Sequence, residues 1–339
     1  MVKEGSTIGP SAYTKSARIQ SRNLDDLIDP GKVYELFAEG ATIVLQALHR
    51  YWTPLAHFCR DLETELTHPV QVNVYLTPPV SQGLDIHYDT HDVFVVQVSG
   101  VKHWKVWHRA FDAPLAHQKR TGKYDDPGPA QVDVELKPGD VLYIPRGFLH
   151  AAQTLDRESA HMTIGVLNVT WADALKRLLE EAESEPQFRG SLPVGFAHDP
   201  ASLEPQLEEV FARFATWASQ QDPSQIAEAL ASKFWSSRTP VLTGQLEQVL
   251  SLDSLSDASV VRRRRGAVCI RRVKGAQLTL VLGDRQLVMP AYVAPAVDRL
   301  LERSPCSVSE LAAHLDAGGR LVLVQRLIRE GLLEQVQGA

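Results

Sequence analysis

Three residues in two separate segments have the types and spacing to bind a metal ion: His87, Asp89 and His150. Side chains alternate between the two faces of a β-strand, so His87 and Asp89 would project to the same side. A second strand could then bring His150 opposite them. Two imidazoles and one carboxylate would occupy one face of the ion and leave the other face open. This ligand set suits a non-haem Fe(II) centre that activates O₂.

The segment that ends at His150 carries the more specific pattern. Gly139, Pro145, Gly147 and His150 have the spacing of the second cupin motif, in which the glycines and the proline make a tight strand connection that directs the histidine inward. The first motif is altered, because ordinary metal cupins have His-x-His followed by a glutamate, whereas this chain has an aspartate in place of the second histidine. The alternative is that the upstream pair belongs to a polar loop after Gly83, but the joint spacing favours a metal site.

A further histidine follows the upstream pair. His91 shares strand parity with His87 and Asp89, so a fourth inward group is geometrically possible. A fourth protein ligand would remove one of the open coordination positions. We therefore expect His91 to face the substrate or to support the ligands rather than to bind the ion.

The composition is that of an ordinary globular protein with two or three domains. The 339 residues are 44% hydrophobic and 22% charged, and the net charge of −6 does not suggest a nucleic-acid or membrane-surface protein. Cys59, Cys269 and Cys306 lie far apart and form no CxxC pair, so we expect reduced thiols. Met1–Tyr13 does not resemble a signal peptide, and no apolar run approaches the length of a membrane span. We expect a soluble cytoplasmic protein with no membrane partner.

The pattern of elements predicts an α+β protein. From Val70 to Leu167, short β-rich runs separated by Gly or Pro turns predict a double-stranded β-helix barrel of the cupin kind. Helical patterns follow, and a Ser- and Asp-rich linker then leads into a small α+β unit with a capping box at Ser307–Glu310. The predicted divisions are a loose, polar N-terminal arm at 1–23, an oxygenase barrel at 24–170, a helical region at 171–249 and a last unit at 250–339.

Four stretches give the barrel a specific resemblance to a known family. Members of the JmjC ribosomal-oxygenase family, which are cupin-superfamily protein hydroxylases, are similar to this chain at Gln71–Pro78, His87–Gln97, Gly100–Trp104 and Leu136–His150. The resemblance implies dependence on Fe(II), 2-oxoglutarate and O₂, with release of succinate and CO₂. It implies a protein or peptide substrate, since family members hydroxylate histidine or arginine side chains of ribosomal proteins. It also implies that the helical region forms a homodimer and that the last unit is a winged helix.

Typical relatives carry a Tyr-Trp motif ahead of the barrel, and this motif is not found at the corresponding place in the sequence. We therefore expect an N-terminus that is either naturally short or truncated.

The resemblance also assigns residues to the cosubstrate. Lys102 takes the position of the lysine that binds the distal carboxylate of 2-oxoglutarate, and the hydroxyl of Tyr75 is expected to assist. A buried lysine is costly unless it is paired, which suits a receptor for an anion. Asn73 shares strand parity with Tyr75, and His161 and Thr163 share parity on a later strand, so these three are weaker candidates. Without the resemblance, Lys102 would be interpreted as a surface lysine that snorkels at a strand end.

The only dense basic run in the chain is Arg262–Arg265. A winged helix could use it on DNA, but the later helix Arg320–Arg329 carries mostly apolar side chains and does not resemble a recognition helix. A nucleic-acid partner is therefore disfavoured, and a solvated strand, an acidic partner surface or ribosomal RNA near a substrate are the alternatives.

Two other functions remain open at this point. One is the same chemistry on a small peptide, a natural product or a methylated lysine. The other is a non-catalytic regulator that binds a ligand or DNA. The intact triad argues against the regulator, because a barrel that only binds a ligand has no need of Fe(II)-type ligands.

Overall fold

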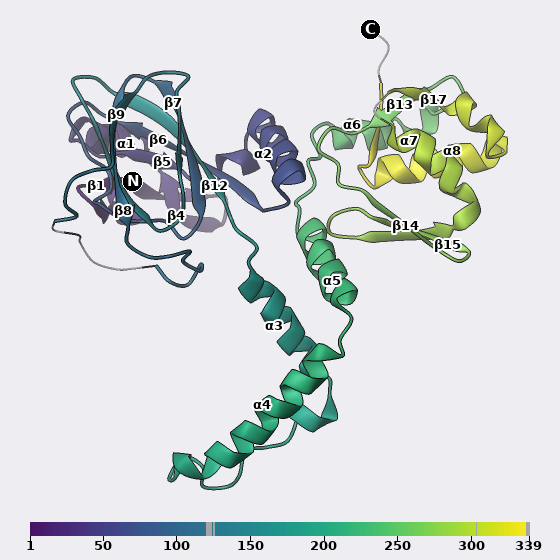
Figure 1. Ribbon diagram of the computed structural model, residues 1–339. Helices are drawn as coiled ribbons and strands as arrows, with labels where there is room; N and C mark the ends of the chain where they lie inside the picture. The colour runs from purple at the N-terminus through teal and green to yellow at the C-terminus, as the bar shows by residue number, and fades with distance from the viewer. Residues whose placement is uncertain (120–123, 125, 303, 337–339) are drawn as a thin grey trace. The chain divides into compact units, whose positions relative to one another are not determined.

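The computed structural model describes residues 1–119, 124, 126–302 and 304–336. The chain divides into two compact units, Met1–Asn168 and Val169–Ala339. The first unit contains the predicted metal ligands and is built mainly from β-strands, whereas the second begins with helices and ends in a mixed α+β region (Figure 1).

Two antiparallel sheets make the barrel of the first unit. The larger sheet has the strand order β10-β7-β12-β6-β5, and the smaller has the order β11-β8-β9. The bounds in the larger sheet are Ile43–Leu45 (β5), Val70–Thr77 (β6), Asp92–Ser99 (β7), Val141–Ile144 (β10) and Ser159–Val166 (β12). Those in the smaller sheet are Lys102–Arg109 (β8), Val132–Leu136 (β9) and Phe148–Thr154 (β11).

The two sheets share one apolar core. Val93 and Val95 of β7 pack in a single cluster with Trp104 and Val106 of β8. These residues alternate with outward-facing ones along each strand, as expected for a sheet with one face in the core. The prediction of a cupin-type barrel in an α+β protein is therefore confirmed.

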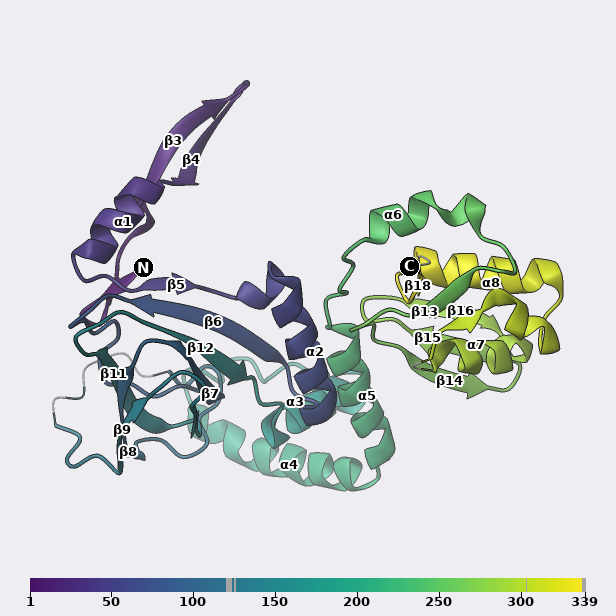
Figure 2. The ribbon, with the colours of Figure 1, turned by 90° about the horizontal axis from the view of Figure 1, so that it is seen from above.

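Helix α2 (Thr53–Leu66) covers the outer face of the larger sheet (Figures 1 and 2). Pro54 in its first turn suits the start of a helix, and the apolar Leu55 and Cys59 lie one turn apart on the same face. That face packs on Val72 of β6 and Ile164 of β12. The larger sheet is thus covered by α2 on one side and lines the barrel interior on the other.

The N-terminal residues 1–23, expected to be a loose arm, form ordered strands. The strands are β1 (Val2–Lys3), β2 (Ser6–Thr7), β3 (Thr14–Ile19) and β4 (Arg22–Ile28), and helix α1 (Pro30–Ala38) follows. The β3–β4 hairpin extends away from the barrel (Figure 2). A two-stranded ribbon that buries neither face leaves no apolar alternation in the sequence, which explains why the pattern predicted no strand there.

The second unit opens with three helices: α3 (Trp171–Ala182), α4 (Glu204–Ser219) and α5 (Pro223–Ser236). Thr170 begins α3 with a capping box closed by Asp173. Helix α3 packs against α5. Phe188, which lies between α3 and α4 in the sequence, forms an aromatic cluster with Phe214 and Trp217 of α4.

The remainder of the second unit has its own large apolar core. Its capping box at Ser307 and Glu310 is present, but it opens a 3₁₀ helix at Val308–Ala313 rather than an α-helix. The other elements are α6 (Gln245–Leu250), α7 (Ala294–Leu301), α8 (Ala317–Arg329), β13 (Val260–Arg263), β14 (Ile270–Lys274), β15 (Gln277–Val281), β16 (Gln286–Pro290), β17 (Cys306–Ser307) and β18 (Leu333–Gln335).

The basic run lies in and after β13, where several of its arginines have structural partners. Arg262 pairs with Glu334 at 2.8 Å, and Arg263 donates to the carbonyl of Ala267. Arg264 is only 5% exposed and donates to backbone carbonyls and to a glutamine side chain. These three arginines are therefore already engaged within the protein and do not form a positive surface available to a partner.

In the part of the chain that the structure describes, no helix combines the length and the apolar character that crossing a membrane requires.

Candidate metal centre

The structure brings His87, Asp89 and His150 together at one end of the barrel. One ligand atom from each lies within 4.8 Å of the others, and Nε2 of His150 is 3.7 Å from a carboxylate oxygen of Asp89. The imidazole centroids of His87 and His150 are 4.3 Å apart. Among the described residues this is the only group of three or more histidine, cysteine or acidic side chains with such a geometry.

Backbone pairing places these ligands. The sequence predicted a strand at His87. In the structure His87 forms only an isolated antiparallel bridge with His150 of β11. The amide of His150 donates to the carbonyl of His87 at 2.8 Å, and the amide of Gly147 donates to the carbonyl of Asp89 at 2.9 Å. Gly147 has φ +85°, and an added Cβ would lie 2.0 Å from the carbonyl oxygen of Phe111. Only glycine fits this turn, which explains its place in the motif.

Both histidines are held in the tautomer that a metal ligand needs. Nδ1 of His87 lies 2.7 Å from the carbonyl oxygen of Asp85, and Nδ1 of His150 lies 3.1 Å from that of Phe148. A carbonyl oxygen can only accept, so each Nδ1 carries the proton and donates it. The Nε2 atom of each ring is left with a free lone pair, as a metal requires.

The charges at neutral pH also match those of a metal site. Burial, together with the neighbouring His87, lowers the pKa of His150 to about 4, so the imidazole is neutral. Burial alone would raise the pKa of Asp89, but the nearby His150 and His87 hold it below its ordinary value. The folded chain therefore presents a neutral imidazole at His150 and a carboxylate at Asp89, which are protonation states that bind a divalent ion.

His91 does not join the triad. Its ring lies against Gly165 of β12, where an added Cβ would come within 2.7 Å of the imidazole. The ring contributes to the electrostatics of Asp89 but does not line the pocket described below. The expectation that His91 stays outside the ligand set agrees with this position, and its role remains a prediction.

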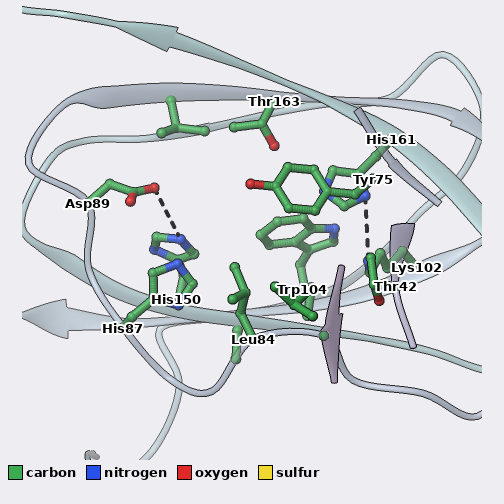
Figure 3. A pocket seen from close by; sticks show the side chains of 15 residues that line it. Thr42, Tyr75, Leu84, His87, Asp89, Lys102, Trp104, His150, His161 and Thr163 are labelled. Carbon is green, nitrogen blue, oxygen red and sulfur yellow. Dashed lines mark hydrogen bonds and ion pairs between the residues drawn. The ribbon is translucent and has the colours of Figure 1, made fainter. Parts of the chain in front are cut away.

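A pocket runs from the triad into the barrel (Figure 3). The triad lies at one end and Lys102 at the other, with Tyr75, Trp104 and Thr163 between them. Of the described residues, Asp89 is the only acidic one that lines the pocket.

Lys102 is buried at the far end of this pocket and is only 4% exposed. Its Nζ donates to Oγ1 of Thr77 at 2.9 Å and lies 3.5 Å from Nδ1 of His161. Burial lowers the pKa of Lys102 to about 7, and none of the ion pairs among the described residues includes it. A buried cation without a carboxylate is a receptor for an anionic ligand. The alternative of a snorkelling surface lysine is wrong.

The other predicted cosubstrate residues fall into two groups. Tyr75, His161 and Thr163 line the pocket, and the rings of Tyr75 and His161 stack with centroids 4.9 Å apart. Asn73 does not reach the pocket, because its side-chain oxygen accepts from the amide of Ala47 at 2.9 Å. Asn73 also hydrogen-bonds Tyr75, so it supports a pocket residue instead of lining the pocket.

Three residues of the pocket region were not singled out by the sequence. Thr77 has the strand parity of Tyr75, which was an available signal, and Trp104 has that of Lys102. Thr42 precedes β5 and hydrogen-bonds Thr77 at 3.2 Å, and no local pattern could have identified it.

Comparison with known proteins defines the class of this barrel. Residues 47–174 match the family model described as the JmjC domain. The match spans both ligand segments and the lysine strand. Over these residues the barrel is therefore similar to a JmjC domain.

The sequence relatives include proteins named ribosomal oxygenases. The chain is 30% identical over 275 residues to the bifunctional lysine-specific demethylase and histidyl-hydroxylase NO66 of Dictyostelium discoideum, covering 75% of this chain and 53% of the relative. It is 41% identical over 138 residues to ribosomal oxygenase 2 of Mus musculus, covering 40% of this chain and 29% of the relative. The chain spans only 33% to 53% of the length of the first three relatives.

Solved structures agree on the fold. YcfD of Escherichia coli has a TM-score of 0.54 at 18% identity, covering 87% of this chain and 79% of that one. A structure of the same protein, described as a ribosomal oxygenase in complex with cobalt and 2-oxoglutarate, has a TM-score of 0.50 at 18% identity, covering 87% of this chain and 78% of that one. The resemblance to JmjC ribosomal oxygenases that the motifs indicated is confirmed by the family model and the relatives together.

Proposed function

We propose that this protein is an Fe(II)- and 2-oxoglutarate-dependent oxygenase that hydroxylates a side chain of a protein. The observation that carries the proposal is one pocket with a two-histidine, one-carboxylate triad at one end and the unpaired cation Lys102 at the other. A dicarboxylic oxo acid has two charged ends, and the pocket offers each of them a partner.

The residues divide the work between metal and cosubstrate. His87, Asp89 and His150 hold the ion from one side, while Lys102 binds the distal carboxylate. Because burial keeps the pKa of Lys102 near 7, an entering carboxylate favours its charged form and the lysine takes up a proton. With metal, cosubstrate and O₂ bound, the centre supplies an oxidation in which one oxygen atom enters a substrate C–H bond, the other enters succinate, and CO₂ leaves.

The substrate class follows from the relatives rather than from the pocket. Their names include ribosomal oxygenases and a histidyl-hydroxylase, which supports a ribosomal protein with a histidine or arginine side chain as the substrate. Iron as the resident metal is part of the same proposal, because a site with N and O ligands also accepts other divalent ions.

The same relatives favour a second candidate reaction. One of them is also named a lysine-specific demethylase, and removal of a methyl group begins with the same hydroxylation chemistry. This candidate predicts formaldehyde when the protein is incubated with methyl-lysine peptides.

We also propose a homodimer formed through the helical region. Trp171, Leu175 and Leu179 follow one another at single-turn spacing along α3 and are 88%, 62% and 53% exposed, so they form an apolar stripe. We also propose that residues 250–339 form a winged helix and that the protein is cytoplasmic. The engaged arginines of the basic run argue against nucleic acid as the partner. Sedimentation of the wild type beside Trp171→Glu tests the dimer.

The function is tested with purified protein and with cells. Succinate should form from 2-oxoglutarate only with Fe(II) present, and His87→Ala should abolish it. His108→Ala is the matched control, because His108 is exposed at the end of β8 and should leave turnover unchanged. Mass spectrometry of ribosomal proteins from cells with and without the gene should reveal one peptide heavier by one oxygen atom. If no protein differs, the assignment to ribosomal proteins fails.

A further inference from the structure

Trp104 lies between the two ends of the pocket. It stands two residues after Lys102 on β8, so both side chains point into the barrel. The indole is 6% exposed, its centroid is 6.2 Å from that of His150, and it meets the ring of His161 edge-on at 5.3 Å. The side chain thus contacts one metal ligand and one residue of the lysine end.

The polar atom of this indole has no partner. Nε1 of Trp104 is buried and has no hydrogen-bond acceptor among the residues that the structure describes. Trp107 on the same strand provides a comparison, since its Nε1 donates to the carbonyl of Gly128 at 3.0 Å. A buried tryptophan normally finds an acceptor, because an orphaned N–H is destabilising. Because the indole of Trp104 lines the pocket, a ligand bound there can supply the missing acceptor.

The surroundings indicate what kind of ligand supplies it. In Figure 3 the nitrogen of the indole faces the end of the pocket that holds Lys102. Lys102 and the hydroxyls of Thr42 and Thr77 gather at that end, and the one acidic lining residue, Asp89, belongs to the opposite end. A group of buried hydrogen-bond donors with no acidic side chain beside it favours the binding of an anion.

We propose that Trp104 Nε1–H donates a hydrogen bond to the distal carboxylate of the oxo acid cosubstrate. The indole is then a second recognition element beside Lys102, and it helps the pocket to select a dicarboxylate over a monocarboxylate. This inference rests on the proposed function, because it assumes that an oxo acid occupies the pocket.

Replacement of the indole by a phenyl ring separates its hydrogen bond from its shape. Trp104→Phe keeps an aromatic side chain and removes the donor, and Trp107→Phe is the matched control, because Trp107 does not line the pocket. Calorimetry with Mn(II)-loaded protein should show 2-oxoglutarate binding about tenfold or more weaker to Trp104→Phe, as expected for a lost hydrogen bond to a charged acceptor. Trp107→Phe should bind with wild-type affinity.

A second measurement on the wild-type protein needs no folded variant at this position. The indole ¹H–¹⁵N resonance of Trp104 should shift downfield when 2-oxoglutarate is added with a diamagnetic metal such as Zn(II). Pyruvate keeps the oxo acid head and lacks the distal carboxylate, so it should leave that resonance almost unmoved. Assignment follows from the spectrum of Trp104→Phe, or from triple-resonance data if that variant does not fold.

The outcomes distinguish the two proposals. If the wild type binds 2-oxoglutarate while Trp104→Phe binds it equally well, or if pyruvate shifts the indole as far as 2-oxoglutarate does, the role of Trp104 is refuted and the oxygenase assignment stands. If the metal-loaded wild type does not bind 2-oxoglutarate at all, the proposed function itself fails.

Discussion

Replacing Lys102 by methionine should make the ligand-free protein more stable while abolishing its cosubstrate affinity. Lys102 is 4% exposed and has no carboxylate partner, so its charge is held in an apolar environment. Methionine has a similar length and removes the charge. A buried lysine that serves to bind an anion should therefore destabilise the folded protein when the anion is absent.

The magnitude follows from the pKa of this lysine. Burial lowers it to about 7 in the folded protein, against about 10.4 in an unfolded chain, and this difference corresponds to a penalty of roughly 4 kcal/mol at neutral pH. The hydrogen bond to Thr77 that methionine loses offsets about 1 kcal/mol. Relaxation around the charge reduces the remainder, so we expect a net gain of about 2 kcal/mol, or several degrees in Tm.

The pH dependence has a definite sign. Between pH about 7 and about 10 the unfolded lysine is protonated and the folded one is not, so the wild type gains stability as the pH rises through this window. Below this pH window Lys102 is protonated in the folded protein as well, and the full cost of burying its charge applies. The advantage of Lys102→Met should therefore be largest at pH 7 or below and disappear near pH 10.

The assay is thermal unfolding of both proteins across this pH range, with and without 2-oxoglutarate and Mn(II). The cosubstrate should raise the Tm of the wild type alone. Calorimetry near pH 8 in two buffers of different ionisation enthalpy should also reveal proton uptake on binding. A variant that is less stable than the wild type at pH 7 without ligand, or a stability difference that ignores pH, would refute the reasoning.

Three further predictions test other parts of the structure. Asp89→Ala removes the only anionic ligand and should weaken Mn(II) binding by about 100-fold or more in calorimetry, and an unchanged affinity would contradict the site. Gly165→Ala places a methyl group 2.7 Å from the ring of His91 and should lower the free energy of unfolding in urea by about 1–3 kcal/mol. Arg264→Ala breaks a buried network and should cost about 3 kcal/mol in the same assay, whereas its exposed neighbour Arg262→Ala should cost less than about 1 kcal/mol, and equal losses would count against this distinction.

The barrel and the candidate metal ligands could be predicted from the sequence because both leave local patterns in the chain. The sequence predicted His87 and Asp89 on one side of a strand, whereas the structure places them in the loop before β7, where an isolated bridge pairs His87 with His150. The glycine at position 147 makes the turn that leads to His150. The family resemblance added Lys102, which the burial of that side chain in the pocket supports.

Other features could be seen only in three dimensions. Asn73 and Tyr75 have the same strand parity, yet only Tyr75 lines the pocket, because the side-chain oxygen of Asn73 accepts a hydrogen bond from the amide of Ala47. The hairpin at 14–28 is held by backbone pairing and buries neither face, so its sequence carries no periodic signal.

Sequence by itself determined the type of chemistry, because the residues that bind a metal must have particular donor atoms and a spacing matched to the strands that carry them. Only the tertiary structure decided which polar groups remain without a partner. The ammonium of Lys102 has a hydroxyl partner but no carboxylate, and the indole nitrogen of Trp104 has no acceptor among the described residues. Whether a buried donor is satisfied is a property of the packed barrel, since its acceptor can come from any strand or from a ligand.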